Sequence, residues 1–194
     1  SLFMSATAFA KDFDWSKCWC TYGGGLKKGD IIIDVGAGFP WDFFDFNPNY
    51  KNWFVPAIEV SAEVPVQIWK LPFSFGGSVI YSSHGYSYAQ KDWNEDYKYF
   101  RHSFATGGLV KYHVHLPPEN LDVYAGLKVG IGANYTGRTE WNWNKNVAEM
   151  KYGNDFFFYH SEIIGASWYF SDGFGVNTEF GYPLVFKAGL SFKF

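Results

Sequence analysis

The feature that most constrains this chain is a strict alternation of apolar residues with small, polar or charged ones. Residues 121–134 show it most clearly, because their apolar positions recur at every second residue without a break. Successive residues of a β-strand point to opposite sides of a sheet, so this segment is predicted to be a strand with one apolar face. That face consists of Leu121, Val123, Ala125, Leu127, Val129, Ile131 and Ala133.

The same alternation recurs often enough to predict an all-β fold of eight strands. In the sixth strand His160 and Glu162 share the apolar face with Ile164, so a β-bulge near Ile163 is expected to restore the phase. Short connections are expected after the second, fourth and sixth strands, and long ones at 40–53, 89–99 and 136–155. The expected strand ranges are 30–39, 57–66, 73–84, 100–116, 121–134, 156–170, 174–180 and 184–194.

The composition fits a closed sheet with rings on one surface and small residues on the other. Aromatic residues make up 23% of the 194 residues, and glycine occurs 21 times. A mean hydropathy of −0.18 is ordinary for a membrane barrel, in which only alternate residues face lipid. The net charge of −3 provides no basic surface, which excludes nucleic acid as a partner.

Alternation alone is also compatible with a soluble eight-stranded calyx, in which the apolar face would point inward. Here the polar face consists mainly of Gly, Ser and Ala with isolated charges. That composition suits the narrow interior of an eight-stranded barrel better than a soluble surface. At about 3.3 Å per residue and a tilt near 40°, residues 121–133 rise by roughly 30 Å, the thickness of a bilayer core. The sequence therefore predicts an antiparallel, up-and-down transmembrane β-barrel.

The N-terminal part of the chain is expected to lie outside this barrel. Residues 1–10 end in Ala8-Phe9-Ala10, which is typical of the end of a secretory signal peptide at its cleavage site. Residues 11–29 have no sustained period and are expected to form a periplasmic segment under or inside the barrel, which spans 30–194. Cys18 and Cys20 are too few for a zinc site and are expected to take no part in chemistry.

The last strand, 184–194, ends on Phe194, which belongs to its apolar face. With this terminal Phe, the strand alternation and the Ala8-Phe9-Ala10 segment, the chain resembles the small eight-stranded outer-membrane proteins of the OmpX, OmpA-barrel and OmpW-like family. The resemblance implies a bacterial outer-membrane location, contact with outer-membrane lipid, and recognition of Phe194 by the barrel-assembly machinery. An even number of strands would leave both chain ends on the periplasmic side and the long loops on the cell surface.

Charged residues on the inward face carry both signs in nearly equal number. An unpaired charge in a narrow interior costs several kcal/mol, so an ion-paired, largely filled interior is predicted. His115 is expected opposite Asp122 across the turn at 117–120. Across the closing seam, two acids are expected to approach two bases: Asp30 and Asp34 towards Lys187 and Lys193. The predicted interior set is Asp30, Asp34, Glu59, Glu63, Arg101, Lys111, His113, His115, Asp122, Lys128, Glu179 and Lys187.

No catalytic, cofactor or metal site is predicted. His113 and His115 share a strand face two residues apart, a spacing that zinc can use, but no third ligand is expected nearby. The run His160-Ser161-Glu162 contains the residue types of a lipid-modifying enzyme. Consecutive strand residues point apart, however, so these side chains do not converge on one reacting atom. The chain is therefore expected not to be an enzyme.

The function favoured by the sequence is a structural or surface-contact role. The connections at 40–53, 89–99 and 136–155 interleave aromatic rings with short polar residues, which favours contact with a surface ligand. The same rings can instead extend the aromatic girdle of the barrel. One alternative is a narrow, OmpW-like conduit for a small or hydrophobic molecule, and another is a lipid-modifying barrel enzyme.

Overall fold

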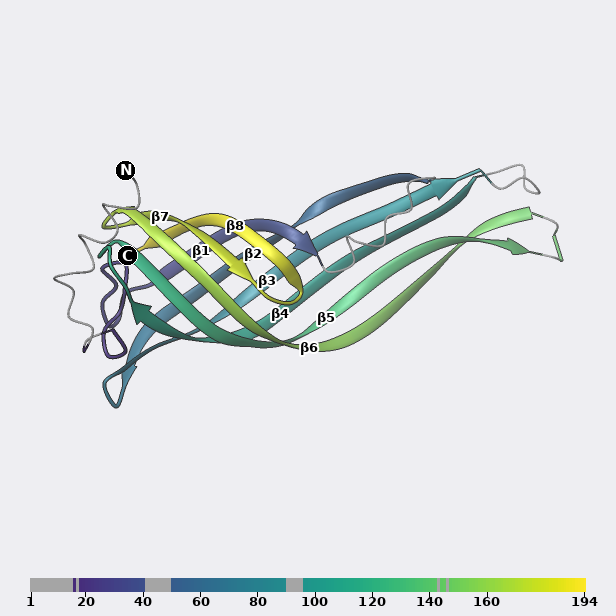
Figure 1. Cartoon of the computed structure of the whole chain (residues 1–194). Coiled ribbons are helices and arrows are strands. Elements are labelled where there is room, and N and C mark those ends of the chain that lie inside the picture. The colour runs from purple at the N-terminus through teal and green to yellow at the C-terminus, as the bar shows by residue number, and fades with distance from the viewer. Residues whose placement is uncertain (1–15, 17, 41–49, 90–95, 143, 146) are drawn as a thin grey trace.

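The computed structural model is a closed barrel of eight antiparallel strands, in which consecutive strands pair and β8 pairs with β1 (Figure 1). It describes residues 16, 18–40, 50–89, 96–142, 144–145 and 147–194. The predicted signal segment 1–10 and most of the loops 40–53 and 89–99 lie outside the described residues. The strands are β1 (Ile32–Pro40), β2 (Lys51–Ile68), β3 (Leu71–Tyr88), β4 (Tyr97–His115), β5 (Leu121–Asn142), β6 (Val147–Ser171), β7 (Phe174–Phe180) and β8 (Leu184–Lys193). The predicted eight-stranded, up-and-down fold is confirmed.

The two faces of the wall differ as the alternation predicts. On the outside, Ile131 exposes 54% of its surface and Phe158 exposes 89%, whereas inside Lys128 exposes 2% and Glu59 exposes 1%. The apolar face therefore points outward and the charged face inward, the reverse of a soluble calyx. A continuous exposed apolar belt of this kind is stable against lipid and not against water, so this barrel is built to span a membrane. In the described part of the chain, no helix has the length and apolar character needed to cross a membrane.

Five strands continue past the point at which the ring is closed. β7 and β8 meet in a turn at 181–183 and β1 ends at Pro40, while β2 to β6 run on together (Figure 1). We call this continuation the extension. It comprises residues 51–55, 83–88, 97–102, 135–142 and 147–154.

The extension replaces the loop that the sequence predicted at 136–155. That prediction was wrong, because β5 reaches Asn142 and β6 begins at Val147. Tyr135 and Thr136 pair directly across the hairpin with residues of β6. The Tyr135 ring also stacks on Tyr152 of β6 with the ring centroids 5.8 Å apart, a cross-strand contact that stabilises the hairpin beyond the ring.

β6 keeps an unbroken register with β5, so the bulge expected near Ile163 is absent. Pairing runs without a shift from Val147 to Trp168, and Ile163 is buried at 3% exposure. His160 and Glu162 therefore stay on the outward face with the apolar residues. The outer wall of the barrel therefore carries two ionisable residues, His160 and Glu162, among its apolar ones.

The end of the barrel that carries the short turns is covered by residues 18–29. The backbone N of Gly29 donates to the carbonyl of Pro65 at 3.0 Å, and the carbonyl of Cys18 accepts from the backbone N of His115 at 3.0 Å. These bonds fix the segment across the mouth. The segment bonds to five strands, β2, β3, β4, β5 and β8, through Pro65, Phe73, His115, Leu121 and Lys193.

Candidate functional site

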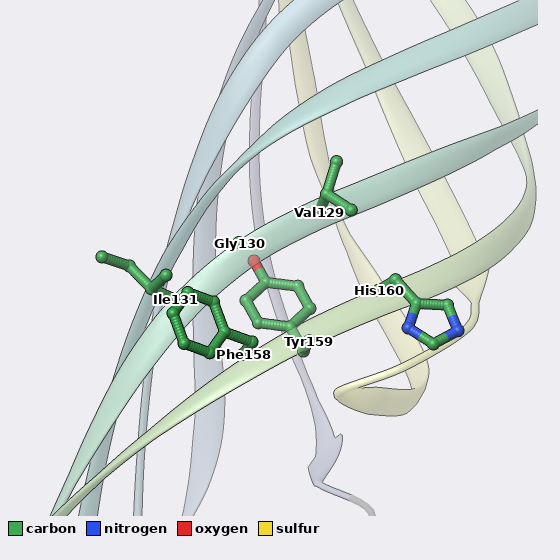
Figure 2. Close-up of a pocket in the computed structure, with 6 residues that line it drawn as sticks. All are labelled: Val129, Gly130, Ile131, Phe158, Tyr159 and His160. Carbon is green, nitrogen blue, oxygen red and sulfur yellow. The ribbon is translucent and has the colours of Figure 1, made fainter.

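The interior of the closed part of the barrel is filled. Where a large side chain lies along the inner face of the wall, the neighbouring strand carries glycine. The Tyr159 ring lies across the backbone of Gly130, as Figure 2 shows, and a Cβ added there would come within 2.7 Å of the ring. The small inward-facing residues are thus the complement of the large ones, which is how eight strands close without leaving a pore.

Near the middle of the lumen, one glutamate joins two lysines from different strands. Oε1 of Glu59 accepts hydrogen bonds from Nζ of Lys128 at 2.7 Å and from Nζ of Lys187 at 2.8 Å. Both lysines also pair with Glu179, in a close contact from Lys128 and at 3.4 Å from Lys187. All four side chains are buried, so water and salt screen their attraction very little.

A second group of buried polar side chains adjoins the first. Nζ of Lys111 donates to Oε1 of Glu63 at 2.6 Å and lies 3.5 Å from Oδ2 of Asp34. Oγ of Ser74 donates to Oε2 of Glu63 at 2.5 Å and lies 2.9 Å from Nε2 of His113. The Ser74 hydroxyl thus connects Glu63 to His113.

His113 contacts an aspartate through its other ring nitrogen. Its Nδ1 lies 2.9 Å from Oδ2 of Asp122, a carboxylate that can only accept. Tyr124 connects the two groups, since Nζ of Lys111 sits 4.2 Å from its ring centroid and its hydroxyl donates to Glu179 at 3.3 Å. We call the combined set the central network: Asp34, Glu59, Glu63, Ser74, Lys111, His113, Asp122, Tyr124, Lys128, Glu179 and Lys187.

Three of the predicted interior residues lie outside the central network. Asp30 precedes β1 and accepts from the backbone N of Lys27 at 2.8 Å. Arg101 lies at the far end of the lumen, where it lines an open cleft. His115 does lie opposite Asp122 in the β4–β5 register, but Asp122 bonds to the next inward position, His113.

The expected seam pairs do not form. Lys193 donates to the carbonyl of Gly24 at 3.2 Å instead of meeting an aspartate. Asp34 pairs with Lys111 of β4, and Lys187 pairs with Glu59 of β2 and Glu179 of β7. Glu179 and Lys187 lie opposite each other on neighbouring strands, whereas the Asp34–Lys111 and Glu59–Lys187 pairs reach across the narrow lumen to strands that are not neighbours in the sheet.

No pairing role was predicted for Ser74 or Tyr124. Both occupy inward positions by the same alternation that identified the charged residues. Their inward orientation could be predicted from the alternation in the sequence. Their partners could not, because these lie on strands far apart in the chain and no local pattern reveals such contacts.

An apolar layer closes the lumen above the central network, at the end next to the extension. Its buried members are Ala57, Ile80, Ala105, Tyr159 and Leu184, with Phe157 packed against them. A cavity lined by Ile80, Ala105 and Leu184 of this layer has a volume of about 30 Å³, which is room for about one water molecule. Residues 18–29, the central network and this layer thus obstruct the lumen at three levels.

Beyond the apolar layer, the inward face continues onto the extension and opens to solvent. Glu140 there contacts Nη2 of Arg138 and Nζ of Lys151, each at 2.6 Å. Hydrogen bonds from Lys151 and Arg138 hold the pKa of the Glu140 carboxyl below its usual value of 4.5. These residues belong to a cleft of about 410 Å³ lined by Tyr99, Arg101, Thr136, Arg138, Glu140, Lys151, Tyr152, Gly153 and Asp155.

Stacked tyrosines border this cleft. The ring centroids of Tyr88 and Tyr97 are 4.9 Å apart, and those of Tyr86 and Tyr99 are 5.1 Å apart. Burial, reinforced by the neighbouring tyrosines, raises the pKa of Tyr86 to about 12. The inner face of the extension thus combines aromatic rings with guanidinium and ammonium groups, which suit contact with anionic or ring-shaped ligands.

The side chains considered for catalysis or metal binding do not converge. Ser161 is buried inside, while His160 and Glu162 are exposed on the opposite face. His113 contacts Ser74 and Asp122. Within the described residues, no group of three or more His, Cys, Asp or Glu side chains is arranged to hold a metal ion.

Comparison with known proteins finds a likeness of fold at low sequence identity. No protein-family model matches the chain, and no curated protein matches it in sequence. The solved structure of Ail, the attachment invasion locus protein of Yersinia pestis, is similar with a TM-score of 0.42 and 12% identity, over 87% of this chain and 100% of that chain. A structure of Ail with the heparin analogue sucrose octasulfate is similar with a TM-score of 0.42 and 11% identity over the same shares, 87% and 100%. The strand pairing of this chain remains the evidence for its fold.

Proposed function

We propose that this protein is a bacterial outer-membrane barrel whose sealed interior supports an extension that contacts ligands outside the cell. The observation that carries the proposal is the change in the inward face where the ring closes. Below that level Glu59 and its partners are buried and paired, whereas above it Glu140 and its partners line an open cleft. A sealed lumen offers no path for transport, and the extension is the part of the molecule available for contact.

The outer-membrane placement is supported by the apolar belt and by the end of β8. Phe194 exposes 74% of its surface, and its backbone exchanges hydrogen bonds of 3.0 Å with Ile31. The Phe194 ring on the outer face is accessible to the assembly machinery that would insert the barrel. In this arrangement residues 18–29 face the periplasm, and the extension faces the exterior.

Surface contact is tested with the full chain in lipid nanodiscs and immobilised polysaccharides. The cleft holds three cationic and two acidic side chains, so an acidic polysaccharide, heparin, is the probe and neutral dextran is its control. We expect heparin to bind and the double substitution Arg138→Gln with Lys151→Gln to weaken binding about tenfold or more, since charge-assisted hydrogen bonds are lost. Lys145→Gln, outside the cleft, is expected to have no effect. Equal binding by all three proteins, or no binding to either polysaccharide, would remove the cleft from the proposal.

A narrow conduit for a small or hydrophobic molecule is the second candidate. It is favoured by the apolar lining at the outer end of the lumen, where Pro183 and Leu184 border the small cavity. Passage would require the pairs of Glu59 and the segment 18–29 to move aside. Conductance in planar bilayers separates the two candidates: a sealed barrel gives no channel events, whereas steady single-channel steps would favour the conduit.

A further inference from the structure

The outer face of β6 carries two ionisable side chains in the middle of the apolar belt. His160 and Glu162 are exposed, and the register places them opposite Val129 and Leu127 of β5. The other outward positions of β5, β7 and β8 in the closed part of the barrel are apolar or threonine: Leu121, Val123, Ala125, Leu127, Val129, Ile131, Phe174, Val176, Thr178, Phe180, Phe186, Ala188, Leu190 and Phe192.

Ionisable side chains at such positions call for a partner. Charge on the lipid face of a barrel is destabilising, most of all near the middle of the bilayer. An ionisable residue at membrane depth therefore marks a functional contact by default. Among the residues that the structure describes, neither the His160 nor the Glu162 side chain has a hydrogen bond or ion pair. Because no described residue of the chain supplies their partner, we look for it in a second molecule.

The surface around this pair has both a hollow and projecting rings. A hollow of about 450 Å³ is lined by Val129, Gly130, Ile131, Phe158, Tyr159 and His160. Figure 2 shows Phe158 and His160 projecting from β6 on either side of Tyr159. Phe158 and Phe156 expose 89% and 85% of their surfaces, more than the belt residues around them. The patch therefore offers an acid, a base, a hollow and rings that can fill a hollow.

We propose that this face of β6 is the contact surface for a second copy of the same chain in the membrane. The occupant must bring an acid to His160 and a base to Glu162. Both copies insert with their extensions on the same side, so the axis that relates them runs along the membrane normal. In such an isologous contact residue i meets j while j meets i, so His160 of each copy meets Glu162 of the other. The exposed Phe158 of each copy packs against the hollow of its partner.

The charge pattern distinguishes this occupant from lipid. Lipid tails provide no charge, and the level of Leu127 and Val129 is the middle of the apolar run 121–133, away from the headgroups on either side. A second copy provides the complementary acid and base at that same level. The inference concerns the outer wall of the barrel and is independent of the cleft on the extension.

The test is a charge-complementation experiment on the full chain in neutrally buoyant detergent, followed by sedimentation equilibrium. His160→Glu places two acids on the patch, and Glu162→His places two bases there. We expect each variant alone to self-associate about tenfold or more weakly than wild type, because close charge pairs become like-charge contacts. An equimolar mixture of the two is expected to associate like wild type, since the acids of one meet the bases of the other. Glu149→His, on the exposed hairpin of the extension, is the matched control, and the gel mobility of unboiled samples verifies that each variant is folded.

Three results would overturn the proposal. The first is a wild-type protein that stays monomeric at every concentration. The second is self-association of His160→Glu or Glu162→His as tight as that of wild type, or a mixture of the two that associates no better than either alone. The third is wild-type association that disappears when co-purified lipid is removed, which would assign the face to lipid instead.

Discussion

Two carboxylates in this protein have similar partners in opposite surroundings. Glu59, inside the closed ring, accepts from two lysines at 2.7 and 2.8 Å. Glu140, on the extension, contacts Arg138 and Lys151 at 2.6 Å each. The Glu59 side chain is 1% exposed and that of Glu140 is 29% exposed. The distances barely differ, so the contrast between the two sites comes from solvent.

That contrast shows how one inward face can serve two purposes. A buried charge that loses its partner has no water to replace it, so each member of the central network holds the others in place. An exposed charge that loses its partner is solvated at little cost. Pairing therefore seals the lumen inside the closed ring. On the extension, the pairs of Glu140 remain free to exchange with a ligand.

The largest expected effect is that of breaking the buried pairs. Lys128→Met leaves Glu59 and Glu179 short of a partner, and we expect a loss of about 3–5 kcal/mol in the free energy of unfolding. The measurement is guanidinium unfolding of the refolded protein in detergent micelles. Lys151→Met, the equivalent change at Glu140, is the control and should unfold like wild type. Equal stability of the two variants would contradict the claim that ion pairs stabilise the closed ring more than they stabilise the extension.

A smaller loss is expected from a neutral member of the central network. Ser74→Ala removes the hydroxyl that joins Glu63 to His113 and leaves both with an unmet hydrogen bond. Unsatisfied buried polar groups cost about 1–3 kcal/mol, so this variant should lie between Lys128→Met and wild type in the same unfolding assay. Ser171→Ala, at an exposed serine, serves as the control. A change at Ser74 that matched the control would show that the Glu63–His113 link contributes nothing.

Acid should break the pairs of Glu140 on the extension. Because the pKa of Glu140 is lowered in the folded protein, its pairs stabilise the extension above the usual value of 4.5 and are lost as pH falls through the lowered value. Carboxyl chemical shifts from NMR should therefore show Glu140 titrating below 4.5. Arg138→Gln should move the pKa of Glu140 back up towards that value. Titration of Glu140 at its usual pKa in the wild-type protein would mean that these pairs do not form.

The smallest expected effect is that of salt. Raising NaCl from 0.1 to 1 M shortens the Debye length from about 10 Å to about 3 Å, which weakens exposed pairs far more than buried ones. The pKa of Glu140 should rise at high salt, while the stability difference between wild type and Lys128→Met should stay the same. If that difference shrank with salt, the central network would have to be open to water.

The strands and their faces were predictable from the sequence, because alternation is a local property. The ranges predicted for the last two strands agree with β7 and β8 to within a residue. The extension was missed because runs such as 136–142 and 147–155 contain the polar and aromatic residues that are also common in loops. The false bulge at Ile163 came from assuming that an ionisable residue cannot face lipid.

The candidate site was less predictable than the fold. The alternation along each strand identified inward residues such as Lys111 and Glu179, but it could not assign their partners. Register would have paired neighbours such as His115 and Asp122, whereas the lumen pairs Asp122 with His113 and Asp34 with Lys111 across the barrel. Such contacts depend on the diameter of the ring and the lengths of the side chains, neither of which is written in a local pattern.

The central claim is that the chain closes into a ring that presents its apolar face to lipid. Gel mobility of the purified protein in SDS, unboiled against boiled, tests this most directly, because a closed ring has no free strand edge and resists SDS until heated. The account predicts a clear shift between the two samples and a requirement for detergent throughout purification. Identical mobility, together with solubility in the absence of detergent, would contradict it.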